Sequence, residues 1–470
     1  MKNINVKNLF KSKSMGNNII VMIFSVLIYL IISLYFTNHY FFNTVINGVD
    51  VSLKAHDDVN HIIRSYIEDY ELQLIESDGK IEEISGPDIG MQYNEKNSIS
   101  KINKLQSSFK WIRSLFKEQE YYVDDLFFYN KDNLENKINQ LDCLNKDIIQ
   151  PQNVSFKYSN GSYEVDKEIY GNKIYTDKLK KAIEKSILEG KTKLDLDKNI
   201  CYENPKYTLS SDKTIETQNL LNKYVSTKVT YIFGSKNEML DADIINQWLN
   251  VDDKLEVVIN EKAVKEYVQG LSKKYDTVGV PRKIKTSINK IVEVKGGFYG
   301  WKINCIAETK ALLENIKLGE LLQKEPIYTQ KGLSRDENEI GNADDIGKTY
   351  VEINITRQHL WYYKDGKLIT QGSVVTGDPN KGNATNVGIY MLNYKQKEAT
   401  LIGHNYESKV TYWMPFNGNI GIHDASWRYS FGSDIYKRNG THGCVNAPLY
   451  LAKTIFNDIE DGTPIICYEE

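Results

Sequence analysis

Two histidines and one cysteine near the C-terminus could together perform nucleophilic chemistry. Seventeen residues separate His423 from the block Thr441-His442-Gly443-Cys444. A cysteine attacks a carbonyl carbon as a thiolate, and a neutral imidazole within hydrogen-bond reach can generate that thiolate near neutral pH. We therefore predict that Cys444 is a nucleophile and that one of the two histidines activates it.

The residues around Cys444 suggest how the reacting groups are arranged. If the segment is extended, His442 and Cys444 point to the same side, and Gly443 between them lets backbone N–H groups approach an oxyanion. His423 can reach Cys444 only through folding of the intervening loop. That loop carries four aromatic side chains that could form a lid or wall over the thiol: Trp427, Tyr429, Phe431 and Tyr436.

Two other interpretations of these residues stay open. Cys444 could be an ordinary buried thiol and both histidines could be core groups, although three such residues lie within 22 positions of a chain that has only seven histidines. His423, His442 and Cys444 could also bind zinc, because both residue types are good ligands. Zinc is the weaker alternative, since a fourth ligand is not evident and neither HExxH nor a paired CxxC motif is present.

The order of the residues along the chain excludes several known cysteine enzymes. Papain-like enzymes have the cysteine before the histidine, but no histidine follows Cys444. Sortases have an arginine after the cysteine, and the last arginine of this chain is Arg438. What remains is a histidine followed by a His-Gly-Cys block.

The elements that must position this block are predicted to be chiefly strands. Apolar and polar residues alternate from Val351 to Ile355, and residues 360–363 face residues 367–376 across a Lys-Asp-Gly turn, which predicts a hairpin. A helix is expected at Pro448–Ile459. These signals indicate a mostly antiparallel sheet or barrel.

The pattern of a histidine followed by Thr-His-Gly-Cys strongly resembles the L,D-transpeptidases with a YkuD-type catalytic domain. The resemblance covers about residues 349–469. Thr441 stands where serine is commoner in the family, and Thr385-Asn386-Val387-Gly388 lacks the proline of the usual turn. Further family-like segments are residues 355–361, 375–377, 412–416 and 421–424.

The resemblance implies acyl transfer on peptidoglycan stem peptides without any cofactor or metal. Cys444 would attack the carbonyl of the third stem residue, a diamino acid, and expel the terminal D-residue. An amine from a second stem would resolve the thioester and form a 3-3 crosslink. Hydrolysis by an L,D-carboxypeptidase using the same site, or a wall-binding scaffold without catalysis, are the alternatives. Carbapenem-type inhibitors are expected to react with the thiol.

Roles for individual residues follow from the same comparison. His423 is the expected general base, with its tautomer set by the backbone carbonyl of Asp424; the Asp424 side chain is disfavoured as the orienting group because it is adjacent to the histidine. The N–H groups of Gly443 and Cys444, helped by His442, would hold the oxyanion. Asn446 would anchor the loop or the substrate, or it could simply cap the following helix. The expected substrate contacts are Asn446, Thr441, Tyr412, Trp413, Trp427 and Arg428.

The N-terminal residues predict a membrane anchor. Ile19–Phe36 is an uncharged stretch long enough to span a bilayer as a helix. No small-residue cleavage site follows, so we expect a retained anchor rather than a signal peptide. Lysines precede the stretch, and the first lysine after it is Lys54, which predicts a cytoplasmic N-terminus and a catalytic domain on the cell-wall side.

The middle of the chain contains an internal repeat. Residues 163–190 match residues 292–319 at a constant offset, and a weaker match pairs residues 62–75 with residues 220–233. The second offset is larger, which predicts about 29 extra residues in the first copy, around Ile102–Glu118. The copies resemble peptidoglycan-binding repeats of Gram-positive wall enzymes, and no binding residues are carried over from that family.

Composition is consistent with this organisation. The 470 residues exceed one domain, and a net charge of -3 disfavours nucleic acid as a partner. The five cysteines form no paired framework. The predicted fold is α+β repeats followed by a mainly β domain, after one transmembrane helix. The predicted boundaries are a cytoplasmic tail at 1–18, the anchor at 19–38, repeats at 45–198 and 205–324, a polar linker at 325–347 and the catalytic domain at 348–470.

Overall fold

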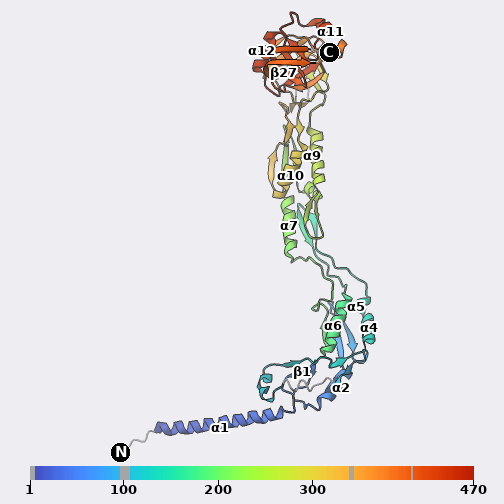
Figure 1. Cartoon of the computed structure of the whole chain (residues 1–470), viewed down its shortest axis with the longest axis vertical. Coiled ribbons are helices and arrows are strands. Elements are labelled where there is room, and N and C mark those ends of the chain that lie inside the picture. Colours follow the sequence, from blue (N-terminus) through green and yellow to red (C-terminus); the bar gives the residue numbers. More distant parts are fainter. Residues whose placement is uncertain (1–5, 96–105, 338–342, 404–405) are drawn as a thin grey trace, which may run out of the picture. The chain divides into compact units, whose positions relative to one another are not determined.

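The computed structural model describes residues 6–95, 106–337, 343–403 and 406–470 (Figure 1). The chain divides into two compact units. The first comprises residues 1–155 and 166–211, and the second comprises residues 156–165 and 212–470.

The first element, α1, spans Val6–Tyr35. Its window Asn18–Tyr35 has a mean hydropathy of 2.4, and only 6% of this window is buried. An uncovered helix of this length and composition is able to cross a membrane, as the sequence predicted for residues 19–38.

The described residues of the first repeat form two three-stranded sheets, one two-stranded sheet and several helices. Ile63, Leu72 and Ile183, from a helix, a strand and a second helix, belong to one buried cluster. Its elements are β1 (Thr44–Ile46), β2 (Val49–Asp50), α2 (Val59–Glu68), β3 (Glu71–Ile75), β4 (Ile81–Ser85), β5 (Gln92–Tyr93), η2 (Ser108–Leu115), β6 (Gln119–Tyr121), β7 (Phe127–Phe128), α4 (Lys131–Asn139), α5 (Asp142–Asn145), α6 (Thr176–Leu188) and β10 (Lys193–Asp195).

The second repeat lies in the second unit together with a preceding hairpin. Tyr231 and Leu312 belong to its buried cluster. Its elements are β8 (Ser155–Ser159), β9 (Ser162–Asp166), α7 (Asp212–Val225), β11 (Lys228–Phe233), β12 (Lys236–Leu240), α8 (Ala242–Ile245), η3 (Asn246–Trp248), β13 (Leu249–Val251), β14 (Val257–Ile259), α9 (Glu261–Tyr275), β15 (Arg282–Lys285), β16 (Ile291–Val294), β17 (Lys302–Ile303), α10 (Cys305–Leu318), β18 (Leu321–Lys324) and β19 (Tyr328–Gln330).

One three-stranded sheet of each repeat has the same topology. In each copy a strand pairs antiparallel with the next strand and parallel with a strand far along the chain: β3 with β4 and β10, and β11 with β12 and β18. The predicted correspondence of residues 62–75 with residues 220–233 is confirmed, because α2 and β3 match α7 and β11. Residues 86–130 separate β4 from α4, whereas only residues 241–260 separate β12 from α9. The extra residues of the first copy therefore lie in this stretch.

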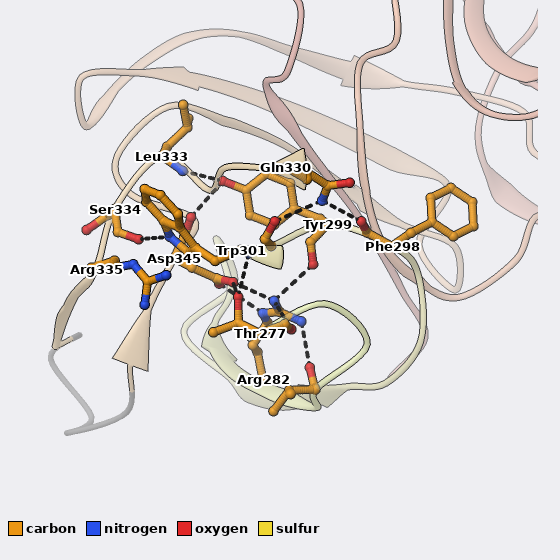
Figure 2. A network of polar contacts seen from close by, with 12 residues as sticks. Thr277, Arg282, Phe298, Tyr299, Trp301, Gln330, Leu333, Ser334, Arg335 and Asp345 are labelled. Atoms are coloured by element: carbon orange, nitrogen blue, oxygen red, sulfur yellow. Dashed lines mark hydrogen bonds and ion pairs between the residues drawn. The ribbon is translucent and has the colours of Figure 1, made fainter. Parts of the chain in front are cut away.

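Part of the segment predicted as a linker is packed onto the second repeat. Asp345 is 2% exposed and forms an ion pair with Arg282, with 2.5 Å between Oδ2 and Nη2 (Figure 2). The Tyr299 hydroxyl donates to the Asp345 carbonyl at 2.6 Å and accepts the Leu333 N–H at 2.8 Å. The polar composition did not reveal this packing, since Arg282 and Tyr299 lie 63 and 46 positions before Asp345. Two short strands also occur here, β20 (Asp336–Glu337) and β21 (Ala343–Asp344).

The C-terminal domain contains two mixed sheets. One has the order β24-β23-β22-β30-β25 and the other the order β26-β27-β28-β29. The strands are β22 (Tyr350–Asn354), β23 (His359–Lys364), β24 (Lys367–Ser373), β25 (Gly388–Met391), β26 (Gln396–Gly403), β27 (Tyr406–Asn417), β28 (Ile420–Asp424), β29 (Val445–Ala447) and β30 (Pro464–Tyr468). The helical segments are η4 (Pro379–Lys381), η5 (Ser433–Ile435), α11 (Tyr436–Asn439) and α12 (Leu449–Asp458).

The predicted hairpin and C-terminal helix of this domain are confirmed as β23–β24 and α12. The domain is mainly β, as predicted, but two of its strand pairs, β22 with β30 and β28 with β29, are parallel. Their partners come from distant parts of the chain, which hairpin signals in the sequence cannot indicate. Leu451 and Ile455 of α12 pack into the same buried cluster as Ile422 and Val445 of the second sheet.

Candidate active site

The parallel strands β28 and β29 bring His423 and Cys444 to one face of the second sheet. Ile422 pairs with Val445 and His423 pairs with Asn446. Ile422 and Val445 both lie in the main core cluster of the domain. Because side chains alternate along a strand, His423 and Asn446 point to the opposite face, and Cys444, two residues before Asn446, lies on that face too.

Trp413 connects the two reactive groups on this face. It pairs with His423 across β27 and β28, with 5.8 Å between the ring centroids. It also belongs to the small buried cluster that contains Cys444. Its indole therefore forms a wall beside both side chains.

The imidazole of His423 is held in one tautomer. Its Nδ1 lies 2.9 Å from the backbone carbonyl oxygen of Asp424. A carbonyl can only accept a hydrogen bond, so Nδ1 carries the proton and Nε2 has a free lone pair. Burial lowers the pKa of His423, and the positive charge of Arg428 adds to this effect. The ring is therefore neutral near neutral pH and able to accept a proton.

The carboxylate of Asp424 has a different task. Its Oδ1 accepts the backbone N–H groups of Thr411 and Tyr412 at 2.8 and 2.7 Å. These bonds hold β27 against the end of β28. The side chain is thus turned toward backbone groups, and the hydrogen bond to His423 comes from the main chain, as the sequence analysis expected.

The thiol of Cys444 is buried and protonated in the resting structure. Burial raises its pKa to about 11, with the backbone N–H of Gly421 opposing that shift. The thiol donates to the carbonyl of Asn419, with 3.6 Å between Sγ and the oxygen. Asn419 lies in the turn between β27 and β28, and nothing in its residue type signalled this contact. The S–H bond is therefore directed at this carbonyl in the resting structure.

The segment before Cys444 bends instead of being extended, which corrects one expectation. The Thr441 hydroxyl accepts the Gly443 N–H at 3.0 Å and donates to the Cys444 carbonyl at 2.6 Å. Gly443 has a φ of +115°, a conformation that favours glycine, and a Cβ there would meet Ile420 Cδ1 at 3.0 Å. As a result, His442 is exposed while Cys444 is buried. The Gly443 N–H, predicted as an oxyanion donor, is bound inside the loop.

Thr385 fixes the next peptide group, a role that the sequence analysis missed. Its hydroxyl accepts the Gly377 N–H at 3.0 Å and donates to the Gly443 carbonyl at 2.7 Å. In a trans peptide the carbonyl and the following N–H point in opposite directions, so Thr385 sets the direction of the Cys444 N–H. Within the described part of the chain, that N–H has no acceptor.

Tyr412 and Thr441, two of the predicted substrate contacts, have side chains that are engaged within the protein. Tyr412 lies in the core cluster and its ring is 5.0 Å from that of Phe456 in α12, so its side chain is on the face away from Cys444. This corrects its assignment, which rested on its position beside Trp413. The Thr441 hydroxyl is engaged inside the loop, as described above.

The other predicted contacts lie closer to the site. Trp427 is 46% exposed, and its ring centroid is 6.0 Å from that of His423. Arg428 is half-buried, and its Nε atom has no hydrogen-bond partner among the described residues. Asn446 is buried and exchanges backbone hydrogen bonds of 2.9 Å with Val375. Of the predicted aromatic lid, Trp427 lies beside His423, whereas Tyr429 is fully exposed and Tyr436 packs against the core cluster of the domain.

Comparison with known proteins gives family matches for two parts of the chain. Residues 348–467 match the family model of the L,D-transpeptidase catalytic domain, YkuD. Residues 82–195 and 207–321 match the model described as "Putative peptidoglycan binding domain". No curated protein is significantly similar to the chain.

Solved structures include relatives from Enterococcus faecium. A Cys-to-Ser variant of its L,D-transpeptidase is 33% identical, covering 54% of this chain and 100% of that chain, with a TM-score of 0.44. The catalytic domain of the same species' enzyme, solved as acylated by ertapenem, is 40% identical, covering 26% of this chain and 98% of that chain, with a TM-score of 0.25.

The catalytic-domain match defines the class of the protein as an acyltransferase that acts on peptidoglycan. Residues 348–467 match the family model, and the solved Enterococcus faecium chain is 33% identical over its full extent, so this chain belongs to the L,D-transpeptidases with a YkuD catalytic domain. Two peptidoglycan-binding domains precede that catalytic domain.

Proposed function

We propose that Cys444 and His423 transfer an acyl group between peptidoglycan stem peptides through a thioester. The observation that carries this proposal is the shared face of β28 and β29, where a neutral imidazole with a free Nε2 lies on the same side as the thiol. A general base must be able to receive the proton of the nucleophile, and the hydrogen bond from Nδ1 to Asp424 leaves Nε2 for that task.

Cys444 and His423 together account for every proton that moves in the reaction. The thiol leaves the Asn419 carbonyl and gives its proton to Nε2 of His423 as sulfur attacks the carbonyl of the third stem residue. Collapse of the tetrahedral adduct breaks the peptide bond, and His423 returns the proton to the departing amine of the terminal D-residue. The side-chain amine of a second stem then attacks the thioester, loses a proton to His423 and releases the thiolate, which takes that proton back.

The oxyanion donor in this proposal is the backbone N–H of Cys444. Thr385 orients its peptide group through the Gly443 carbonyl, and Thr441 holds the bend on the other side. A donor fixed before the reaction stabilises developing charge without reorganisation. In this proposal His442 is a supporting group, and Thr441 and the Gly443 N–H position the loop.

Arg428 is the proposed contact for a substrate carboxylate. Its guanidinium lies near enough to His423 to lower the pKa of the imidazole, and its buried Nε lacks a partner among the described residues. An unpaired buried donor is costly unless a ligand supplies an acceptor, and a carboxylate is the preferred one for arginine. Trp413 and Trp427 would flank the stem peptide beside it.

The same proposal includes the location of the enzyme. We propose that α1 is a retained anchor with a cytoplasmic N-terminus and that all later residues lie on the cell-wall side. The support is the apolar, uncovered window Asn18–Tyr35 and the lysines that precede it. The repeats would then contact peptidoglycan strands near the membrane.

Analysis of wall fragments tests the function. Incubating the full-length protein with wall material should produce muropeptides with 3-3 crosslinks, each formed with loss of one D-residue. Mass measurement after digestion distinguishes these from trimmed, uncrosslinked stems. Trimmed stems alone would indicate an L,D-carboxypeptidase, and an unchanged profile would indicate a wall-binding scaffold.

Alkylation of Cys444 should depend steeply on pH. Because burial holds the thiol pKa at about 11, the thiolate fraction should rise about tenfold per pH unit across the neutral range. Intact-protein mass after brief treatment with iodoacetamide measures the rate, and the Cys444→Ser variant corrects for the other cysteines. A rate that is already constant between about pH 6 and 8 would reveal a preformed thiolate–imidazolium pair and contradict the neutral resting state.

A further inference from the structure

Residues 108–116 belong to the extra residues of the first repeat, and they pack against the C-terminal end of α1. The hydroxyl of Tyr29 donates to the carbonyl of Phe109, and the indole N–H of Trp111 donates to Ser33 Oγ at 3.2 Å. The rings of Trp111 and Tyr29 stack with 5.8 Å between centroids, and Phe36 completes the cluster. The short helix η2 (Ser108–Leu115) is thereby attached to the last two turns of α1.

Several large apolar side chains in and directly after η2 are exposed, although the Phe109 ring also lies 6.5 Å from that of Tyr29. Phe116, the residue directly after η2, is 86% exposed, and Phe109 is 58% exposed. Ile112 and Leu115 are exposed as well. A soluble surface rarely carries four large apolar side chains so close together, and a contiguous patch of this kind marks a site of contact.

Three cations interrupt this apolar set. Lys110, Arg113 and Lys117 are all exposed, and residues 106–117 contain no acidic residue. Aromatic and aliphatic side chains mixed with lysine and arginine are the composition of helices that lie in the interface of an anionic membrane. The exposed acidic residues Glu118 and Glu120 follow only just before and within β6, outside this apolar and basic set.

η2 lies beside the part of α1 that is apolar enough to span a membrane, which indicates that lipid covers the exposed apolar side chains of η2. Tyr29 and Ser33 lie inside the apolar window Asn18–Tyr35. At 1.5 Å per residue, Tyr29 is about 9 Å below the end of that window, so a bilayer that surrounds the window also reaches η2. The exposed apolar side chains of η2 therefore lie beside the apolar window of α1.

We propose that η2 with Phe116 is a membrane-surface element that inserts into the outer leaflet beside α1 and contacts anionic lipid headgroups through its cations. The inference rests on the proposed anchoring by α1. It assigns a role to the extra residues of the first repeat, whose counterpart in the second repeat is shorter. Insertion would tie the first repeat to the bilayer surface, since β6 (Gln119–Tyr121) directly follows and pairs with β1 (Thr44–Ile46).

Photocrosslinking of the full-length protein in vesicles tests the proposal. A photoreactive p-benzoylphenylalanine replaces Phe24, Phe109, Phe116 or Phe128 in turn, and mass spectrometry counts phospholipid adducts. Phe24 lies in the apolar window, and Phe128 is an exposed aromatic residue of β7 in the same unit. We expect adducts at Phe24, Phe109 and Phe116, with yields at least about tenfold above Phe128.

The outcomes separate the two proposals. An adduct at Phe24 without one at Phe109 or Phe116 would overturn the membrane-surface element and leave the anchor intact. The absence of an adduct at Phe24 would overturn the anchor and, with it, this inference. A crosslink from Phe116 to a second copy of the chain in place of lipid would assign the patch to self-association and contradict the inference.

A charge-reversed variant tests the headgroup contact. Lys110→Glu, Arg113→Glu and Lys117→Glu together should reduce the lipid adduct at Phe116 by about tenfold in vesicles that contain phosphatidylglycerol, and much less in phosphatidylcholine alone. The lipid adduct at Phe24, measured in the same charge-reversed variant, is the control that α1 is still inserted, and acylation of Cys444 by a carbapenem reports that the second unit is folded. Equal losses in both lipids would contradict a specific contact with anionic headgroups.

Discussion

Replacing Cys444 with alanine is expected to abolish crosslinking and acylation by a carbapenem, with a loss of at least about 10⁴-fold, because no other side chain of the site can form the thioester. Cys444→Ser should be almost as inactive, since a hydroxyl beside an ordinary histidine is a much weaker nucleophile than a thiolate. Intact-protein mass should show one carbapenem adduct on the unmodified protein. Peptide mapping should assign it to the segment from Asn439 to Asn446.

The other cysteines provide matched controls. Cys467 is fully buried in β30, and burial raises the pKa of its thiol, while Cys305 begins α10 in the second repeat. Cys467→Ala and Cys305→Ala should alter stability more than activity, as is usual for small packed thiols. Adducts spread over several cysteines, or crosslinking by Cys444→Ala, would show that Cys444 is an ordinary thiol.

Replacing His423 with alanine is expected to reduce the acylation rate by about 10²- to 10⁴-fold, the usual contribution of a general base. His442→Ala should cause a smaller loss, because His442 is exposed and Cys444 is buried. Single-turnover acylation by a carbapenem measures both variants without a second substrate. The Cys444 carbonyl and Gly443 N–H stay bound to Thr441 in either variant, so the loop itself should be retained.

The pH dependence of the His423→Ala variant identifies the role. If the imidazole only removes a proton, raising the pH should recover part of the lost rate, because hydroxide generates more thiolate until the pH approaches the thiol pKa of about 11. His423→Gln, which keeps a side chain of similar size, is the matched control for packing against Trp413. A larger loss in His442→Ala than in His423→Ala would exchange the roles of the two histidines.

Residue types and spacing were sufficient to predict much of this protein. The histidine and the Thr-His-Gly-Cys block indicated the chemistry, because few side chains generate a thiolate and their order along the chain excluded other enzymes. The apolar stretch, the internal repeat and the β23–β24 hairpin were equally evident. Each of these depends on short-range patterns: an uninterrupted apolar run, a constant offset, or alternation across a turn.

Only the tertiary structure decided which groups meet. Alternation in β27 and β28 turned Trp413 toward the thiol and Tyr412 into the core, although the two are adjacent. Thr385 reaches the Gly443 carbonyl from 58 positions away, and Arg282 reaches Asp345 across 63. Such contacts depend on strand register and on the closure of long loops, and a single sequence contains no local signal for either.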